Sequence, residues 1–189
     1  MTRLIYITHP ETVVDPHLPI KQWQISENGW KHAMRLVKRS WWQEVDVIYS
    51  SKENKALRVA EQIADHWEHL KLPFGNEELE EVDRSAAGFL KTEDYEKTKG
   101  EFFSNPLASS NGWETADAAT KRTMKVISQI MEENVNKTVA IVGHGLVGSL
   151  LICSLKKIPP AETMLQETQG SIIEVDWDKK KLLSMWISY

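Results

Sequence analysis

Two apolar runs near opposite ends of the chain each end on a histidine. Leu4–Thr8 leads into His9, and Thr138–Gly143 leads into His144. Both runs are short, rich in β-branched residues and bounded by loop-forming residues, which predicts buried strands. In an open α/β sheet, binding and catalytic groups lie just beyond the carboxyl ends of the strands. The two imidazoles are therefore candidates for one active site, although a single histidine at a strand end is more often only packed or capped.

Segments typical of strands and helices alternate along the rest of the chain. Further strands are expected at 45–49, 171–176 and 182–187, a short extended segment at 72–83, and helices from Ser26 onward and at 54–69, 93–103, 115–133 and 146–155. This alternation predicts an α/β fold, a three-layer α/β/α sandwich with a mostly parallel sheet. The last two strands flank a short polar turn and predict a hairpin that gives the sheet an antiparallel edge. No linker divides the chain, so we expect one domain over residues 1–189.

Composition excludes several classes of protein. The 189 residues carry a net charge of −4, which gives no support to general nucleic-acid binding. The apolar runs are too short to span a membrane, and the N-terminus enters a strand without a signal-peptide pattern. The single cysteine, Cys153, fits a reducing compartment and stands in an apolar helical segment. We therefore expect a cytoplasmic protein with no nucleic-acid or membrane partner, and composition leaves homo-oligomerisation open.

Six short motifs carry the chemistry of this chain. They are Thr8-His9-Pro10-Glu11-Thr12, Ile25-Ser26-Glu27-Asn28-Gly29, Ser50-Ser51-Lys52-Glu53-Asn54-Lys55-Ala56, Leu79-Glu80-Glu81-Val82-Asp83-Arg84-Ser85, Trp113-Glu114-Thr115 and Val142-Gly143-His144-Gly145. In type and order they resemble the motifs of the histidine phosphatase superfamily, the phosphoglycerate-mutase-like proteins. Each motif is loose alone, but six in the same order over nearly the whole chain are specific. The resemblance implies the phosphoglycerate-mutase-like fold and phosphoryl transfer without a metal or other cofactor.

The resemblance also implies a role for each matched residue. His9 would be the nucleophile that attacks phosphorus to give a phosphohistidine, which splits the transfer into two easier steps. Glu81 would be the general acid for the leaving oxygen, which requires a raised pKa. His144 would donate a hydrogen bond to the phosphoryl oxygens, and Gly145 follows it at the helix start. Lys55, near a helix N-terminus, would supply fixed positive charge.

Three positions depart from the family pattern. Thr8 replaces the arginine before the nucleophile, and Lys55 replaces a second arginine, which keeps the charge but loses the planar fork that grips phosphate. Pro10 replaces a glycine and removes one backbone N–H. A charge-assisted hydrogen bond is worth about 1.5–3 kcal/mol. We therefore expect weaker phosphate binding than in a usual family member, or a substrate that brings its own contacts; low-micromolar phosphate or vanadate binding would contradict this.

Two arginines are candidates to replace the missing charge. Arg84 lies three residues beyond Glu81, and Arg58 lies one helical turn beyond Lys55. We favour Arg84 of the two because its segment borders the pocket in the family, although a surface ion pair is the more common arrangement for an arginine. His66 and His69 have helical i, i+3 spacing that suits a metal, but their acidic neighbours favour a solvated helix face.

Four functions remain open from the sequence. A phosphatase acting on a small phosphorylated substrate is favoured, and a phosphoprotein substrate also fits an anion pocket with a short variable cap. A phosphoglycerate-mutase-type phosphotransferase is the first alternative. A non-catalytic member that binds a phosphorylated ligand is the second, because Thr8 and Lys55 replace the usual arginines. A metal-dependent hydrolase is a further class, and it predicts loss of activity with chelators.

Overall fold

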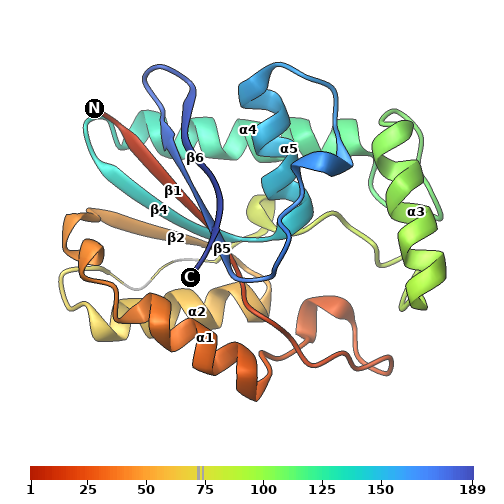
Figure 1. Ribbon diagram of the computed structural model, residues 1–189, viewed down its shortest axis with the longest axis horizontal. Helices are drawn as coiled ribbons and strands as arrows, with labels where there is room; N and C mark the ends of the chain where they lie inside the picture. Colours follow the sequence, from red (N-terminus) through yellow and green to blue (C-terminus); the bar gives the residue numbers. More distant parts are fainter. Residues whose placement is uncertain (72, 74) are drawn as a thin grey trace.

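The β-sheet forms the centre of the computed structural model, which describes residues 1–71, 73 and 75–189. Within these residues, six strands pair in the order β3-β2-β4-β1-β5-β6 (Figure 1). Their bounds are β1 Arg3–Thr8, β2 Val47–Ser51, β3 Gly75–Asn76, β4 Thr138–Gly143, β5 Ser171–Asp176 and β6 Lys181–Ser188. β1, β2, β3 and β4 run parallel to their neighbours in this set. The predicted, mostly parallel α/β sheet is confirmed.

Two cores lie on opposite faces of this sheet because consecutive strand residues point to opposite sides. Leu4 and Tyr6 of β1 join a cluster with α4 (Ala116–Glu133) and α5 (Gly145–Lys156). Ile5 and Ile7 join a second cluster with α1 (Glu27–Val37) and α2 (Asn54–His66). Figure 1 shows α1 and α2 below the sheet and α4 and α5 above it. The three-layer sandwich expected from the sequence is therefore present.

The hairpin at the end of the chain is also confirmed. β5 runs antiparallel to β1, and β6 runs antiparallel to β5 and forms the edge of the sheet. Lys180 at the turn has a positive φ of 52°. Every second residue of β6 is exposed, as expected for a strand with one face toward water.

Two predicted boundaries differ from the structure. The helix expected to reach residue 69 ends at His66, because the indole of Trp67 turns aside and donates a hydrogen bond to the carbonyl of Val37 at 2.8 Å. The segment expected to be extended over 72–83 contains β3 and then a 3-10 turn, Glu77–Leu79; positions 72 and 74 of that prediction lie outside the described residues.

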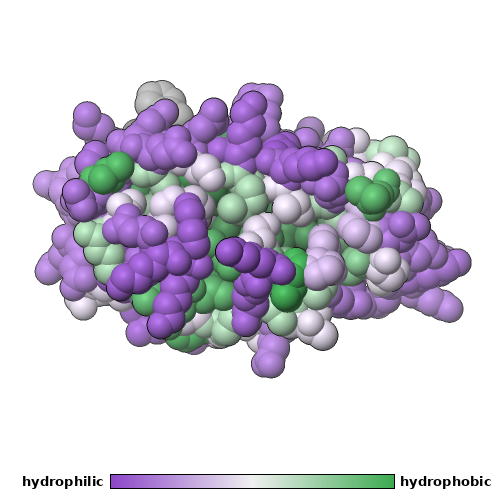
Figure 2. Space-filling model, turned by 90° about the horizontal axis from the view of Figure 1, so that it is seen from above, coloured by the Kyte–Doolittle hydropathy of each residue, from purple (hydrophilic) through white to green (hydrophobic). Residues whose placement is uncertain are grey.

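A further helix, α3 (Thr92–Ser104), lies at one end of the molecule, at the right in Figure 1. The face seen in Figure 2 is hydrophilic at both ends, and hydrophobic side chains gather along its middle between hydrophilic ones. Such a mixed surface is ordinary for a folded domain. In the described part of the chain, none of the helices combines the length and the apolar character that crossing a bilayer requires.

Candidate active site

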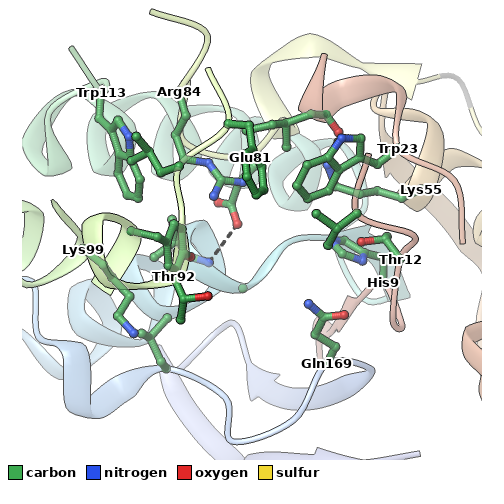
Figure 3. Close-up of a pocket in the computed structure, with 18 of the residues that line it drawn as sticks. His9, Thr12, Trp23, Lys55, Glu81, Arg84, Thr92, Lys99, Trp113 and Gln169 are labelled. Atoms are coloured by element: carbon green, nitrogen blue, oxygen red, sulfur yellow. Dashed lines mark hydrogen bonds between the residues drawn. The ribbon is translucent and has the colours of Figure 1, made fainter. Parts of the chain in front are cut away.

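A cavity of about 410 Å³ opens at the carboxyl ends of the parallel strands. Five of the seven site residues predicted from the sequence line it: His9, Lys55, Glu81, Arg84 and Gly145. They come from the ends or flanks of β1, β2 and β4 and from the segment after the Glu77–Leu79 turn. The parallel pairing of β1, β2 and β4 therefore brings together residues that are far apart in sequence (Figure 3).

His9 is held in a single orientation. Its Nδ1 lies 2.8 Å from the carbonyl oxygen of Pro10, an acceptor that requires the proton to sit on Nδ1. Its backbone N–H donates to Gly143 at 3.1 Å, which ties the end of β1 to β4. Burial and the nearby Lys55 ammonium lower the pKa of His9 to about 4. The imidazole is therefore neutral near pH 7, and Nε2 carries the free lone pair.

His144 is fully buried behind His9. The two ring centres are 5.2 Å apart, and the rings meet edge to face. Its Nε2 lies 2.8 Å from the hydroxyl oxygen of Ser51, and its backbone N–H donates to the Tyr6 hydroxyl at 3.0 Å. Its Nδ1 is buried and has no hydrogen-bond partner among the described residues. Burial lowers the pKa of this imidazole well below its usual range.

Glu81 sits against the first turn of α5. Its carboxylate oxygens accept the backbone N–H groups of Leu146 and Val147 at 3.1 Å each, and that of Val82 at 3.0 Å. Figure 3 shows one of these hydrogen bonds as a dashed line from Glu81. Burial raises the pKa of this carboxyl, and it outweighs Arg84 and the backbone hydrogen bonds, which favour the anion. A carboxylic acid with a raised pKa at the wall of a cavity is suited to proton donation.

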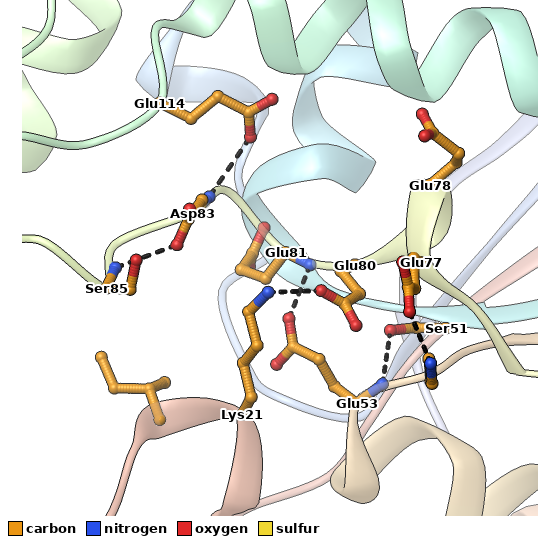
Figure 4. Close-up of polar contacts among 12 residues, drawn as sticks. Lys21, Ser51, Glu53, Glu77, Glu78, Glu80, Glu81, Asp83, Ser85 and Glu114 are labelled. Carbon is orange, nitrogen blue, oxygen red and sulfur yellow. Dashed lines mark hydrogen bonds and ion pairs between the residues drawn. The ribbon is translucent and has the colours of Figure 1, made fainter.

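Lys55 is buried at the start of α2 and is neutralised by a second acid. Its ammonium pairs with the Glu53 carboxylate and donates to the carbonyl oxygen of Ile20 at 3.2 Å. The other Glu53 oxygen accepts the backbone N–H of Glu81 at 2.8 Å (Figure 4). Burial alone would raise the pKa of Glu53, but His144, Lys55 and this N–H together hold it below its usual range.

Glu53 is a residue of the site that the motifs did not single out. It stands inside the motif that carries Lys55, two positions earlier. Its backbone is extended and precedes the helix, so its side chain is free to turn back to the lysine ammonium. The sequence did offer one signal for Glu53, which is an acidic residue within a segment that was expected to bind an anion.

Arg84 extends into the cavity, and Figure 3 shows its guanidinium beside the Glu81 carboxyl. Its central carbon lies 5.3 Å from the ring centre of Trp113 and 5.6 Å from that of Tyr95. Among the described residues it forms no ion pair, unlike exposed Arg58, which pairs with half-buried Glu61 at 3.0 Å. Of the two candidate arginines, only Arg84 therefore lies where a bound anion would meet it.

Thr8 lies outside the cavity lining, as does fully buried His144, in contrast to the predicted binding residues Lys55, Arg84 and Gly145. Its hydroxyl donates to the side-chain oxygen of Gln166 at 2.5 Å and accepts the Ser171 N–H at 2.9 Å. The Gln166 amide in turn lies over Gly145, where an added Cβ would come within 2.9 Å of its nitrogen. Gln166 lines the cavity, and Thr8 holds the Gln166 side chain through their hydrogen bond. Thr8 therefore acts on the site indirectly. No motif in the sequence pointed to Gln166.

The outer part of the cavity is largely aromatic and apolar. Trp23 and Phe89 face each other with ring centres 6.5 Å apart, and Tyr95 and Trp113 form the wall beneath Arg84. Lys99 of α3 also lines the cavity, but Glu96 and Glu162 pair with it at 2.5 and 3.1 Å. Phe102 and Phe103 of α3 belong to the core.

The histidine pair considered for metal binding does not form a helical face. His69 lies beyond the end of α2, and its Nε2 is 3.1 Å from the carbonyl oxygen of Val45. The ring of His66 packs against Trp67. Within the part of the chain that the structure describes, no three His, Cys, Asp or Glu side chains are grouped as metal ligands.

Comparisons with known proteins agree with this fold. The sequence model of the histidine phosphatase superfamily (branch 1) matches residues 20–187, a range that begins after His9. The structure of YhfR from Bacillus stearothermophilus has a TM-score of 0.80 at 23% identity, with 96% of this chain and 94% of that chain covered. A search among curated proteins finds no match.

Two further solved structures are similar over nearly their whole length. A mycobacterial glucosyl-3-phosphoglycerate phosphatase with inorganic phosphate has a TM-score of 0.81 at 16% identity, covering 100% of this chain and 98% of that one. Phosphoserine phosphatase from Entamoeba histolytica, in complex with 3-phosphoglyceric acid, has a TM-score of 0.81 at 22% identity and the same coverage. At these identities the structures establish the fold, and the family model matches most of the chain. The chain belongs to the histidine phosphatase superfamily (branch 1).

Proposed function

We propose that this protein is a phosphatase that hydrolyses a small phosphomonoester through a phosphohistidine on Nε2 of His9. The orientation of His9 carries this proposal. Its Nδ1 proton is committed to the Pro10 carbonyl at 2.8 Å, and its lowered pKa leaves Nε2 unprotonated at neutral pH. A neutral imidazole with a fixed tautomer at a cavity wall is an activated nucleophile.

The first step transfers the phosphoryl group to His9. The bond between Nε2 and phosphorus forms as the bond between phosphorus and the ester oxygen breaks. Protonated Glu81, which lines the same cavity, gives its proton to the departing oxygen. The raised pKa of Glu81 supports this assignment, since a carboxyl that is already ionised cannot protonate a leaving group.

The second step regenerates the enzyme. The Glu81 carboxylate accepts a proton from water, the water oxygen attacks phosphorus, and the bond between phosphorus and Nε2 breaks to release inorganic phosphate. Glu81 is then protonated again and His9 is neutral. Arg84 is placed to stabilise the transferring oxygens, because it is the lining cation without a carboxylate partner among the described residues.

The leaving group of the substrate would occupy the aromatic part of the cavity. A volume of about 410 Å³ suits a small metabolite-sized ester. Its walls, with Trp23, Phe89, Tyr95 and Trp113, favour an ester that has an apolar or planar body. The similar structures include phosphatases of phosphoserine and of a glucosyl phosphoglycerate, and esters of that size are the first to assay.

The decisive experiment compares wild type, His9→Ala and His17→Ala on p-nitrophenyl phosphate and a panel of phosphomonoesters. His17 is an exposed histidine of the same N-terminal region and serves as the matched control. We expect His9→Ala to lose activity by roughly 10³-fold or more and His17→Ala to keep it. A phosphoenzyme that is labile in acid and stable in base should form on wild type and on His17→Ala, and should be lost in His9→Ala. Full activity in His9→Ala would refute the mechanism.

A non-catalytic role in binding phosphorylated ligands is the second candidate. One observation favours it: the Lys55 charge is neutralised by Glu53, and Thr8 turns away from the cavity, so the pocket has less net positive charge than the resemblance implied. Saturable binding of phosphomonoesters without turnover on any of them would support this candidate over the phosphatase.

A further inference from the structure

A buried carboxylate stands behind the second histidine of the site. One Glu53 oxygen lies 3.8 Å from Nε2 of His144, and both side chains are almost completely buried. Ser51 connects the same two groups: its hydroxyl oxygen accepts the Glu53 backbone N–H at 3.1 Å and lies 2.8 Å from His144 Nε2. The Glu53 backbone therefore fixes a serine that contacts the imidazole, while its side chain faces that imidazole.

The protein groups that line the cavity supply too little positive charge for a doubly charged phosphoryl group. Lys55 is cancelled by Glu53, and Lys99 is cancelled by two acids. Arg84 remains as one cation, and Thr8 supplies none. A phosphomonoester carries a charge close to −2 above its second pKa of about 6. A buried charge without compensation is costly, so binding requires a further positive charge.

Of the two imidazoles, only His144 can supply that charge without loss of the nucleophile. A proton added to His9 would occupy Nε2, because Nδ1 already donates to Pro10. His144 has a buried Nδ1 without a partner in the described residues, and its Nε2 faces the Glu53 carboxylate. The titratable or charged groups facing His144 are Tyr6 on β1, His9 after β1, Glu53 and Lys55 at α2, and Arg84 after the Glu77–Leu79 turn. Glu53 is the group among them that favours an imidazolium.

We propose that Glu53 is a positioning residue through which His144 takes up one proton from solvent when a phosphoryl dianion binds. The resulting imidazolium supplies the charge that Thr8, in place of an arginine, does not. No covalent bond changes in this step, and the proton returns to solvent when phosphate leaves. The inference rests on the proposed function only in taking this cavity as the phosphoryl site.

The test measures protons taken up on binding, with sulfate as the probe. Sulfate is a tetrahedral dianion that does not titrate near neutral pH, so any proton taken up belongs to the protein. Calorimetric titrations at about pH 7.5 in buffers of different ionisation enthalpy give the number of protons bound. We expect close to one proton for wild type and below about 0.2 for Glu53→Gln. Glu80→Gln is the matched control, because Glu80 pairs with Lys21 at 2.5 Å, and it should behave as wild type.

A second variant and a spectroscopic signal keep the proposal testable if Glu53→Gln does not fold. The double substitution Glu53→Gln, Lys55→Gln removes the buried ion pair as a unit and keeps the net charge. It should also lose the uptake. In wild type, the ring nitrogens of His144 should shift to imidazolium values in NMR spectra when sulfate is added.

Three results would overturn the proposal: no proton uptake by wild type, uptake that persists in both Glu53 variants, or no sulfate binding at all. Turnover does not enter this measurement. An active phosphatase without proton uptake would therefore refute this inference alone, and proton-linked sulfate binding without turnover would refute the catalytic role alone.

Discussion

Acidification should destabilise this protein through His9, and the size of the effect follows from its burial. The pKa of His9 is lowered to about 4 in the folded protein, and a histidine in an unfolded chain titrates near 6.5. Between these two values the unfolded chain binds more protons than the folded one. The free energy of unfolding therefore falls as the pH drops below 6.5, because protons bind His9 more readily in the unfolded chain. The decrease levels off below about pH 4.

The magnitude is obtained by integrating that difference in bound protons. Between about pH 7 and pH 5 the linkage amounts to about 2 kcal/mol, out of a typical total stability of about 5–15 kcal/mol. His9→Asn removes the titration, and its amide is able to donate to the Pro10 carbonyl in place of Nδ1. The variant should lose about 2 kcal/mol less than wild type over this pH range.

The assay is urea unfolding of wild type, His9→Asn and His17→Asn at both pH values. His17 is exposed in the folded protein, so its variant should follow wild type. All other groups, among them His144 and Glu53, titrate in every sample. Their contributions to the change in the free energy of unfolding therefore cancel in the comparison. If His9→Asn and wild type lost the same free energy within about 0.5 kcal/mol, His9 would not be held neutral by burial.

Three further predictions concern a cap, a close contact and the acid. Ser26→Ala removes the oxygen that accepts the Gly29 N–H at 2.9 Å and should lower the unfolding free energy by about 1 kcal/mol, whereas an unchanged urea midpoint would contradict this cap. Gly148→Ala would bring a Cβ within 2.7 Å of the Trp186 ring and should cost about 1–3 kcal/mol in the same titration. Glu81→Gln should remove the decline of kcat/KM that wild type shows as pH rises through the raised pKa of Glu81; a decline that survives would assign it to another group.

The motifs of the sequence located most of the site. His9, Lys55, Glu81, Arg84 and Gly145 all line one cavity. His9 was found at the end of a predicted strand, and the other four were found through motifs that resemble those of the histidine phosphatase superfamily. The hairpin 171–188 and the start of a helix at Ser26 could be predicted from the sequence, because turn residues and helix-capping hydroxyls act within a few positions. The end of α2 could not be predicted in this way, because the hydrogen bond from Trp67 to Val37 joins segments thirty residues apart.

The sequence by itself therefore determined the family, the layered α/β fold and the identity of the histidines at the strand ends. Tertiary structure decided how charge is arranged around them. Whether Lys55 acts as a free cation depends on the direction of the Glu53 side chain. Whether Thr8 contacts the ligand depends on its hydrogen bond to Gln166, a residue far away in the sequence. Interaction between charges depends on distance and burial, and neither quantity is encoded in the spacing of residues along the chain.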